Sequence, residues 1–246
     1  MTIAKILASK WTKVGFFLAC AIPFVRLSPS VLVALNLVPD SAATAISQNS
    51  FFVTIGPNPV EFITHYTGDW LLRFLLITLM VTPLRNLLNR PQLARFRRML
   101  GLFAFFYGIL HLATWAWLDK QFDPSEMWKD IMKRWYITVG MAGLLGMTPL
   151  AMTSTAGWVR RMGYKRWQTL HRTVYFCGIA GVTHYYLLVK SDIRLPSMYA
   201  AILAVLLVYR VIKRRRIRNN EHSPEVNYGT EICGVAAGAT SLRKRS

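Results

Sequence analysis

The sequence predicts an all-α integral membrane protein, a bundle of six transmembrane helices with both termini on the cytoplasmic side. Hydrophobic residues make up 53% of the 246 residues and charged residues only 17%, whereas about a quarter of the residues of a typical soluble domain are charged. The formal net charge is +19. Because the basic residues lie in short runs between long apolar segments, this charge indicates a membrane protein and not one that binds nucleic acid.

Six segments meet or approach the roughly 20 mainly apolar residues that a bilayer-spanning helix needs. The first contains Pro23 and Arg26, and the second is short. We expect one membrane domain over 1–218 and a flexible cytoplasmic tail over 219–246, where small and polar residues show no helical period. The predicted spans are 14–37, 68–84, 99–118, 135–152, 168–189 and 196–212.

The charges between the spans predict the orientation. The segments 85–98 and 153–167 and the run KRRRIR at 213–218 carry Arg and Lys without an acidic residue, whereas 38–67 has neither Lys nor Arg. Cytoplasmic loops carry the Lys and Arg excess, so the three basic segments are predicted to lie inside. The predicted outer loops are 38–67, 119–134 and 190–195.

Three histidines fall within the predicted spans, and an ionisable side chain inside a bilayer indicates function because it is costly there. His111 lies twelve residues into the third span and His184 sixteen residues into the fifth, at depths of about 18 Å and about 24 Å. Both spans run outward, so the two imidazoles lie at comparable depth and are candidate axial ligands of a haem iron. His171 lies about 20 Å further in than His184.

Other interpretations of these histidines stay open. A membrane histidine often only hydrogen-bonds a hydroxyl or carbonyl group of a neighbouring helix. Thirteen residues separate His171 from His184, which places them about 140° apart around the helix axis. An alternative ligand pair is His111 with His171. A different class of function is a haem-free transporter or scaffold whose histidines line a polar pathway.

Seven short motifs follow one another along the chain, and their order and spacing resemble the MsrQ (YedZ) family of haem-binding membrane subunits of bacterial methionine sulfoxide reductase systems. This family belongs to the ferric-reductase-like transmembrane group. The resemblance covers about residues 14 to 215, and the segment 38–55 and the tail after about 218 do not match. The motifs are GPNPVEFITHYTG at 56–68, TPLR at 82–85, RRMLGL at 97–102, HL at 111–112, TST at 153–155, WQTLHRTVY at 167–175 and HYYLL at 184–188.

The resemblance implies a six-helix, ferric-reductase-like core with haem b between the third and fifth helices. Members of the group with two haems carry two histidines on each of these helices. Here the third helix has only His111, and Arg97 and Arg98 stand where the inner partner is expected. We therefore expect one haem, on His111 and His184. The family is also associated with FMN, and arginine suits a flavin phosphate because it binds phosphate in bidentate fashion.

Five residues are weaker candidates for contacts with a cofactor. Trp167 and Tyr175, near the inner end, are placed to pack on a cofactor ring, and Arg73 to contact a haem propionate or a quinone headgroup. Arg97 and Arg98 are the candidates for flavin phosphate. Four of the five also have a structural explanation: inside-positive charge for Arg97 and Arg98, anchoring at the interface for Trp167, and snorkelling for Arg73.

The predicted function is that of a multi-pass electron carrier in the bacterial inner membrane, without substrate chemistry of its own. The resemblance implies electrons from the quinone pool or from a cytoplasmic flavin or NAD(P)H donor. It also implies a periplasmic molybdopterin reductase, MsrP, as the acceptor, which reduces methionine sulfoxide in oxidised periplasmic proteins. A transmembrane ferric-ion reductase of the same fold is the alternative among redox proteins.

Overall fold

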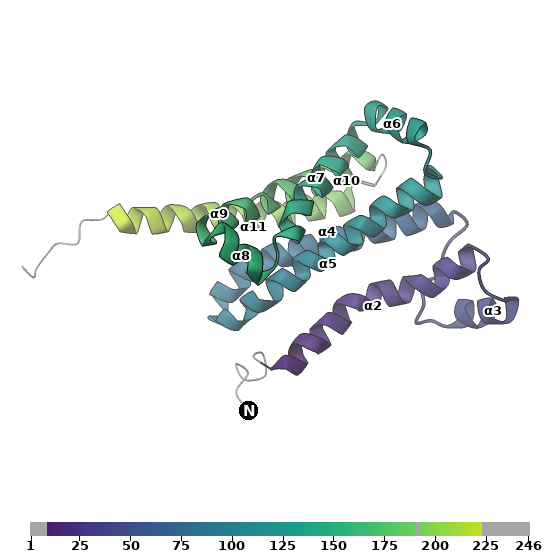
Figure 1. Cartoon of the computed structure of the whole chain (residues 1–246), viewed down its shortest axis with the longest axis horizontal. Helices are drawn as coiled ribbons and strands as arrows, with labels where there is room; N and C mark the ends of the chain where they lie inside the picture. The colour runs from purple at the N-terminus through teal and green to yellow at the C-terminus, as the bar shows by residue number, and fades with distance from the viewer. Residues whose placement is uncertain (1–8, 190–191, 223–246) are drawn as a thin grey trace, which may run out of the picture. The chain divides into compact units, whose positions relative to one another are not determined.

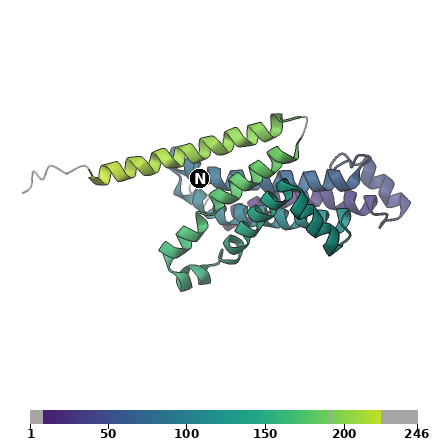
Figure 2. The ribbon, with the colours of Figure 1, turned by 90° about the horizontal axis from the view of Figure 1, so that it is seen from above.

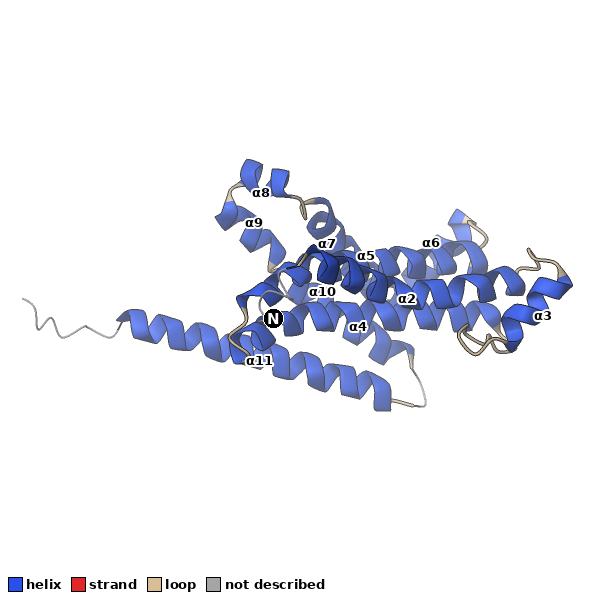
Figure 3. Cartoon of the chain, turned by 90° about the horizontal axis from the view of Figure 1, so that it is seen from below, coloured by secondary structure: helices blue, strands red, loops and turns tan. Residues whose placement is uncertain are grey.

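The computed structural model describes residues 9–189 and 192–222, and these residues are helical or lie in short connections (Figure 3). No strand occurs within the two ranges, which confirms the all-α prediction. Parts of the predicted loop 190–195 and of the predicted tail 219–246 lie outside the described residues. A compact unit ends at Leu207, and the described residues from Val208 to His222, which form the rest of the last helix, are described by themselves.

Five helical stretches within the described ranges are long and apolar enough to cross a membrane, which confirms a multi-pass membrane protein. They differ from the predicted spans mainly at their ends. The last of them extends through His222, past the expected domain boundary at residue 218. The first two stretches are α2 (Lys10–Ala34) and α4 (Pro59–Leu87). The third, Pro91–Asp119, consists of three consecutive elements: η1 (Pro91–Leu93), α5 (Ala94–Ala113) and the π-helical η2 (Thr114–Asp119). The fourth is α7 (Trp135–Met152), and the fifth is Arg194–Arg216 within α11 (Arg194–His222).

The fifth predicted span, 168–189, is not continuous. The chain forms α9 (Tyr164–His171), turns at residues 172 and 173, and restarts as α10 (Val174–Leu188). The 15 residues of α10 rise about 22 Å, which is shorter than the roughly 30 Å of a bilayer's hydrocarbon core. The count of six spans is therefore not confirmed by helix length.

Local sequence explains why α4 begins nine residues before the predicted span. The side chain of Asn58 accepts a hydrogen bond from the backbone N–H of Glu61, and its amide donates to the Glu61 carboxylate at 2.8 Å. Pro59 occupies the first helical position, where its missing N–H costs nothing. Because of this cap, α4 begins before its apolar part. Polar residues such as His65 therefore belong to the same helix as the membrane span.

Two antiparallel helix pairs form the core of the compact unit: α5 lies along α4, and α10 lies along α7 (Figures 1 and 2). Leu79, Ala104 and Tyr107 are completely buried there. The hydroxyl of Tyr107 donates a hydrogen bond to the carbonyl of Cys20 on α2 at 3.3 Å. Because the two helices of each pair are antiparallel, the start of one helix lies beside the end of the other.

Four short helices lie wholly or partly in segments that were predicted to be loops, and α9 also includes the first four residues of the fifth predicted span. Asp123 caps α6, because its carboxylate accepts from the backbone N–H of Ser125 at 2.8 Å. Helices α8 and α9 form a hairpin to one side of α7 and α10 (Figure 2), with Gly163 at the turn in a left-handed conformation, φ 76°. The short helices are α3 (Asp40–Gln48), α6 (Pro124–Lys133), α8 (Ala156–Met162) and α9.

Candidate functional site

A cavity of about 450 Å³ lies between α4, the end of α5 with η2, α7 and α10. Helices α4 and α7 begin at this end of the compact unit and α5 and α10 end there, so the antiparallel pairing brings four helix ends around one space. The cavity volume is typical of a site for a cofactor or other small molecule. Its inner wall is apolar and includes Leu71, Leu72, Leu75, Leu144 and Met147.

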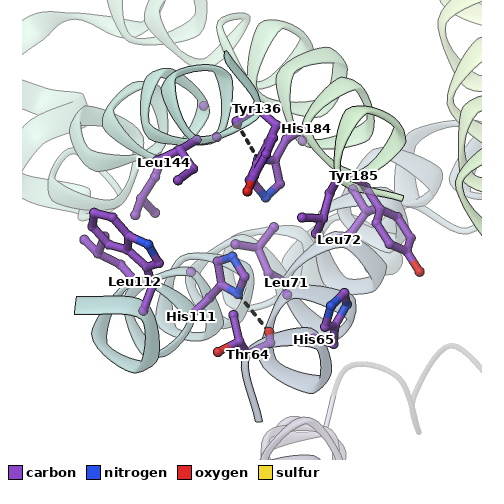
Figure 4. Close-up of a pocket in the computed structure, with 18 of the residues that line it drawn as sticks. Thr64, His65, Leu71, Leu72, His111, Leu112, Tyr136, Leu144, His184 and Tyr185 are labelled. Carbon is purple, nitrogen blue, oxygen red and sulfur yellow. Dashed lines mark hydrogen bonds between the residues drawn. The ribbon is translucent and has the colours of Figure 1, made fainter. Parts of the chain in front are cut away.

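His111 of α5 and His184 of α10 face each other across this cavity (Figure 4). Their ring centroids are 6.1 Å apart and their planes are nearly perpendicular, at 84°. Two imidazoles that bind one metal ion from opposite sides at about 2 Å place their ring centroids roughly 6 to 6.5 Å apart. The observed separation therefore matches a single metal between the two rings.

The His111 ring is held by the backbone of α4. Its Nδ1 donates to the carbonyl oxygen of Thr64 at 2.9 Å (Figure 4). Gly68 follows four residues later, and a Cβ at that position would lie 3.0 Å from Cε1 of the imidazole. Glycine at 68 therefore leaves the side of α4 open, so that the imidazole reaches a carbonyl group that is otherwise covered by the next turn.

The same device holds His184 on α7. Its Nδ1 donates to the carbonyl oxygen of Tyr136 at 2.5 Å (Figure 4). Gly140 again follows four residues later, and a Cβ there would lie only 2.7 Å from this Nδ1. The two helix pairs thus hold their histidines in the same way. In each pair one helix, α4 or α7, supplies a carbonyl and a glycine, and its partner, α5 or α10, supplies the histidine.

These hydrogen bonds define the chemistry of both rings. A carbonyl oxygen only accepts, so the proton of each neutral imidazole lies on Nδ1 and the lone pair lies on Nε2. A neutral imidazole with Nδ1–H bonded to a backbone carbonyl is the usual state of a metal-ligating histidine. Each ring is therefore set up to bind a metal through Nε2.

The protein offers few other ligands for a metal at this site. Within the described ranges, no group of three or more His, Cys, Asp or Glu side chains is placed to hold a metal ion. A metal between His111 and His184 must therefore obtain its remaining ligands from a non-protein group. A porphyrin supplies four equatorial nitrogens and leaves two axial positions, which fits two opposed imidazoles in a mostly apolar cavity.

Polar side chains line the other end of the cavity. Asn58, Glu61 and His65 come from the first turns of α4, and Asp119 and Arg134 come from the segments that flank α6. His65 Nε2 lies 4.0 Å from the Glu61 carboxylate. The cavity is therefore amphiphilic, with a polar end where α4 and α7 begin.

His171 lies elsewhere and does not line the cavity. Its ring stacks on Trp167 with centroids 4.0 Å apart, and its Nδ1 donates to the Trp167 carbonyl at 3.1 Å. Trp167 in turn donates from Nε1 to the carbonyl of Thr153 at 3.0 Å. Arg97 and Arg98 of α5 lie within electrostatic range of His171. The structure thus groups His171, Trp167 and the two arginines, apart from the pair His111 and His184.

The other two candidate cofactor contacts also lie outside the cavity lining. Arg73 interacts with Asp69 at 3.5 Å and with the hydroxyl of Tyr199 at 3.1 Å, and its guanidinium lies over the Trp70 ring at 4.9 Å. Tyr175 packs against the apolar core. Arg73 is thus engaged by protein groups, and only its ion-pair partner Asp69 borders the cavity.

The four residues that hold the imidazoles were not predicted from the sequence: Thr64, Gly68, Tyr136 and Gly140. Thr64 and Tyr136 contribute only backbone carbonyls, which no side-chain pattern reveals. The glycines gave a usable signal, since each lies in an apolar helix facing a histidine of the neighbouring helix. Two other glycines, Gly178 and Gly181, lie on the histidine-bearing helix α10 itself.

Comparison with known proteins shows the family of this chain. Residues 45–182 match the family model described as ferric reductase like transmembrane component. Several relatives are each named protein-methionine-sulfoxide reductase heme-binding subunit MsrQ. The relative from Herminiimonas arsenicoxydans is 46% identical over 83% of this chain and 87% of its own length. The chain belongs to the MsrQ family.

Two further MsrQ relatives show the same extent of similarity. The one from Xanthomonas euvesicatoria pv. vesicatoria is 52% identical over 78% of this chain and 92% of its own length, and the one from Rhodospirillum rubrum is 50% identical over 69% and 82%. No solved structure matches the chain. The family resemblance predicted from the ordered motifs is therefore confirmed.

Proposed function

We propose that this protein is a haem b-binding, electron-carrying membrane subunit of a protein-methionine-sulfoxide reductase. The observation that carries the proposal is the pair His111 and His184, opposed at 6.1 Å across a cavity with apolar walls. The names of the MsrQ relatives, which describe heme-binding subunits, support it independently. A bound haem supplies reversible one-electron transfer, and the protein supplies its position and surroundings.

The chain's own residues would fix the potential and the selectivity of such a group. His111 and His184 would bind the iron through Nε2. The carbonyls of Thr64 and Tyr136 would keep both rings neutral and oriented, and hydrogen bonds of this type raise the basicity of the ligand. Leu71, Leu144 and their apolar neighbours would exclude water from the macrocycle. With both axial positions occupied by histidine, the protein would carry electrons without binding a substrate at the metal.

The membrane arrangement proposed with this function is six spans in a bacterial inner membrane, with both termini inside. The basic segments 85–98 and 153–167 support it through the inside-positive rule. The cavity then opens toward the periplasm, where the acceptor MsrP, a molybdopterin reductase for methionine sulfoxide in oxidised proteins, would dock. The donors proposed are the quinone pool or a cytoplasmic flavin or NAD(P)H reductase.

The group around His171 supports FMN as a second cofactor. The stacked rings of Trp167 and His171 offer an aromatic surface, and Arg97 and Arg98 supply two cations close by. Arginine binds phosphate in bidentate fashion, so this cluster suits a phosphorylated flavin. In the proposed orientation it lies at the cytoplasmic end, where electrons would enter. Arg73 is not part of this cluster, because its partners are Asp69 and Tyr199.

Absorption spectroscopy on purified protein tests the haem proposal. The protein is produced with ample haem, purified in detergent, and recorded oxidised and reduced with dithionite, with haem quantified per chain. We expect a reducible b-type spectrum in the wild type and its loss in His111→Ala and in His184→Ala. His65→Ala is the control, since His65 borders the cavity on the exposed side and should leave the spectrum intact.

His171→Ala separates the two ligand assignments. We expect this variant to keep the haem spectrum, because His171 does not line the cavity, and to lose any bound flavin fluorescence. Loss of haem in His171→Ala, with haem retained in His184→Ala, would instead favour the pair His111 and His171. A well-folded wild type that binds no haem would leave these histidines as packing or pathway residues.

A second function, the reduction of ferric ions, is favoured by the description of the matching family model, ferric reductase like transmembrane component. The two functions differ in the electron acceptor. Membrane vesicles with reduced haem are mixed either with the purified periplasmic reductase and methionine sulfoxide or with ferric citrate. Reoxidation by the reductase alone supports the sulfoxide system, and reoxidation by ferric citrate alone supports the metal reductase.

A further inference from the structure

The polar end of the cavity holds a buried hydrogen-bond donor without an acceptor. Trp115 lines the cavity four residues after His111, on η2. Its indole Nε1 is buried and has no hydrogen-bond partner among the described residues. An indole N–H only donates, and buried donors in native proteins are nearly always paired. Trp115 therefore presents a hydrogen-bond donor that is available to an acceptor in the cavity.

Arg134 supplies positive charge at the same end. Among the described residues that line the cavity, it alone carries a permanent positive charge. Its Nη1 donates to the hydroxyl of Tyr136 at 3.1 Å, and its Nε lies 3.4 Å from the carboxylate of Asp130. A guanidinium has five N–H donors in a planar fork, so these two contacts leave donors for a further carboxylate.

The acidic residues that line the cavity have partners of their own. Asp69 pairs with Arg73 at 3.5 Å, and Asp119 pairs with Lys120 at 3.2 Å. Glu61 accepts a hydrogen bond from the amide of Asn58 at 2.8 Å. These contacts reduce the negative potential at the polar end. Among the described contacts, none of these three acids forms a direct ion pair with Arg134.

We propose that Trp115 and Arg134 form the binding site for the two propionate carboxylates of the haem. This inference rests on the proposed function. A haem is an apolar disc with two carboxylates on one edge. The apolar end of the cavity, with Leu75, Met147 and Cys177, would leave carboxylates without solvation or partners, which is costly. The polar end offers one cationic and one neutral donor, and bonds from charged donors to carboxylate are the strong ones.

Tyr136 links this site to the axial ligand. Its carbonyl accepts from His184 and its hydroxyl accepts from Arg134. Arg134 therefore has a second way to influence haem binding, by holding the start of α7 in place. A useful test must separate direct contact with a carboxylate from this positioning effect.

Haem and its dimethyl ester separate the two effects, because the ester lacks the carboxylate charge and keeps the iron and the macrocycle. The full-length variants Arg134→Gln and Trp115→Phe are loaded with each compound, and dissociation is followed by transfer to apomyoglobin. We expect each variant to release haem about tenfold faster or more, which is the loss of one charge-assisted bond. Release of the ester should accelerate much less, because its neutral carbonyl accepts a weaker hydrogen bond than a carboxylate does. Lys129→Gln is the control, since Lys129 is exposed on α6, where it pairs with Glu126 at 3.0 Å, and does not line the cavity.

Equal acceleration for haem and ester in Arg134→Gln and Trp115→Phe would overturn the proposal in favour of a positioning role. Unchanged haem release in both variants would overturn it as well. If the wild type takes up no ester, the propionate bending band in the resonance Raman spectrum of the haem complex decides. A band shift in both variants but not in Lys129→Gln supports the site, and an unshifted band refutes it. A wild type that binds neither compound contradicts the proposed function itself.

Discussion

At the scale of single residues, the candidate site depends on two glycines as much as on two histidines. Each imidazole reaches a backbone carbonyl on a neighbouring helix because the residue four positions after that carbonyl has no side chain. The histidines were found from the sequence because an ionisable group in an apolar span is conspicuous. The carbonyls could not be found, because every residue has one and only the packing of two helices selects which of them is used.

The substitution Gly140→Ala tests this dependence. A Cβ at 140 would lie 2.7 Å from His184 Nδ1, which is closer than carbon and nitrogen approach without a bond, so the imidazole must move off the Tyr136 carbonyl. We expect loss of most haem per chain, measured from the reduced spectrum. The helix itself should tolerate the change, since alanine is favoured over glycine in a helix by about 1 kcal/mol.

Gly15→Ala is the matched control for that experiment. Gly15 also lies in an apolar helix, and a Cβ there meets nothing within 4 Å. This variant should bind haem as the wild type does and unfold at the same or a slightly higher temperature. A Gly140→Ala protein with wild-type haem content and spectrum would show that the carbonyl contact does not position His184.

At the scale of elements, hydropathy located the spans but not their interruptions. A window of apolar residues reports the preference of side chains for lipid and says nothing about whether the backbone stays helical. Residues 168–173 carry a single charge, on Arg172, so the prediction joined them to the apolar run that follows, whereas residues 164–167 were assigned to the inner loop. In the structure α9 ends at His171 and α10 begins at Val174, which separates His171 from His184 more completely than one straight helix would.

Helix α6 illustrates a different limit. The segment 119–134 mixes acidic and basic residues and was treated as a loop, yet these charges fix a helix against the bundle. Asp130 is buried and interacts with Lys120 at 2.7 Å and with Arg134 at 3.4 Å. The charge count alone did not reveal which acid meets which base, because the pairing depends on the turn at residues 120–123.

The substitution Asp130→Asn is expected to weaken this junction. It leaves Lys120, whose side chain is 14% exposed, without its closest counter-charge, and removing one partner of a mostly buried pair costs about 2 to 4 kcal/mol. The free energy of unfolding in detergent, measured by chemical denaturation, should fall by that amount. Glu126→Gln is the control: its pair with Lys129 is more than half exposed on both sides, so a change above about 0.5 kcal/mol is not expected.

A small or absent effect of Asp130→Asn, equal to that of Glu126→Gln, would contradict the assigned role of this junction. The outcome also bears on the cavity. Arg134 begins the connection into α7, and Tyr136 follows two residues later with the carbonyl that holds His184. A weakened junction should therefore broaden or shift the haem spectrum even where the haem content is unchanged.

At the scale of the whole molecule, the open question is whether α10 crosses the membrane. With 15 residues it is shorter than the other apolar helices. An odd number of spans would place the termini on opposite sides and would put the basic run KRRRIR at 213–218 outside, against the inside-positive rule. Six spans require α10 to separate the α8–α9 hairpin from the start of α11.

Cysteine accessibility in intact cells distinguishes the two arrangements. We would introduce Arg160→Cys on α8, Arg194→Cys at the start of α11 and Lys129→Cys on α6, all at exposed positions. The native Cys20 and Cys177 are buried, and Cys233 is replaced by serine. A membrane-impermeant maleimide should label residues 129 and 194 in cells with a permeabilised outer membrane, and residue 160 only after lysis.

The comparison of residues 160 and 194 decides the count, because only α9, α10 and the connection that follows lie between them. Labelling of both from the same side would mean that α10 does not cross, and the chain would then have five spans. His184 would in that case lie in a helix that enters the membrane and returns on the same side. Labelling from opposite sides would show that 15 helical residues with their flanking segments cross the bilayer, which requires local thinning of the bilayer or polar side chains that reach out from its ends.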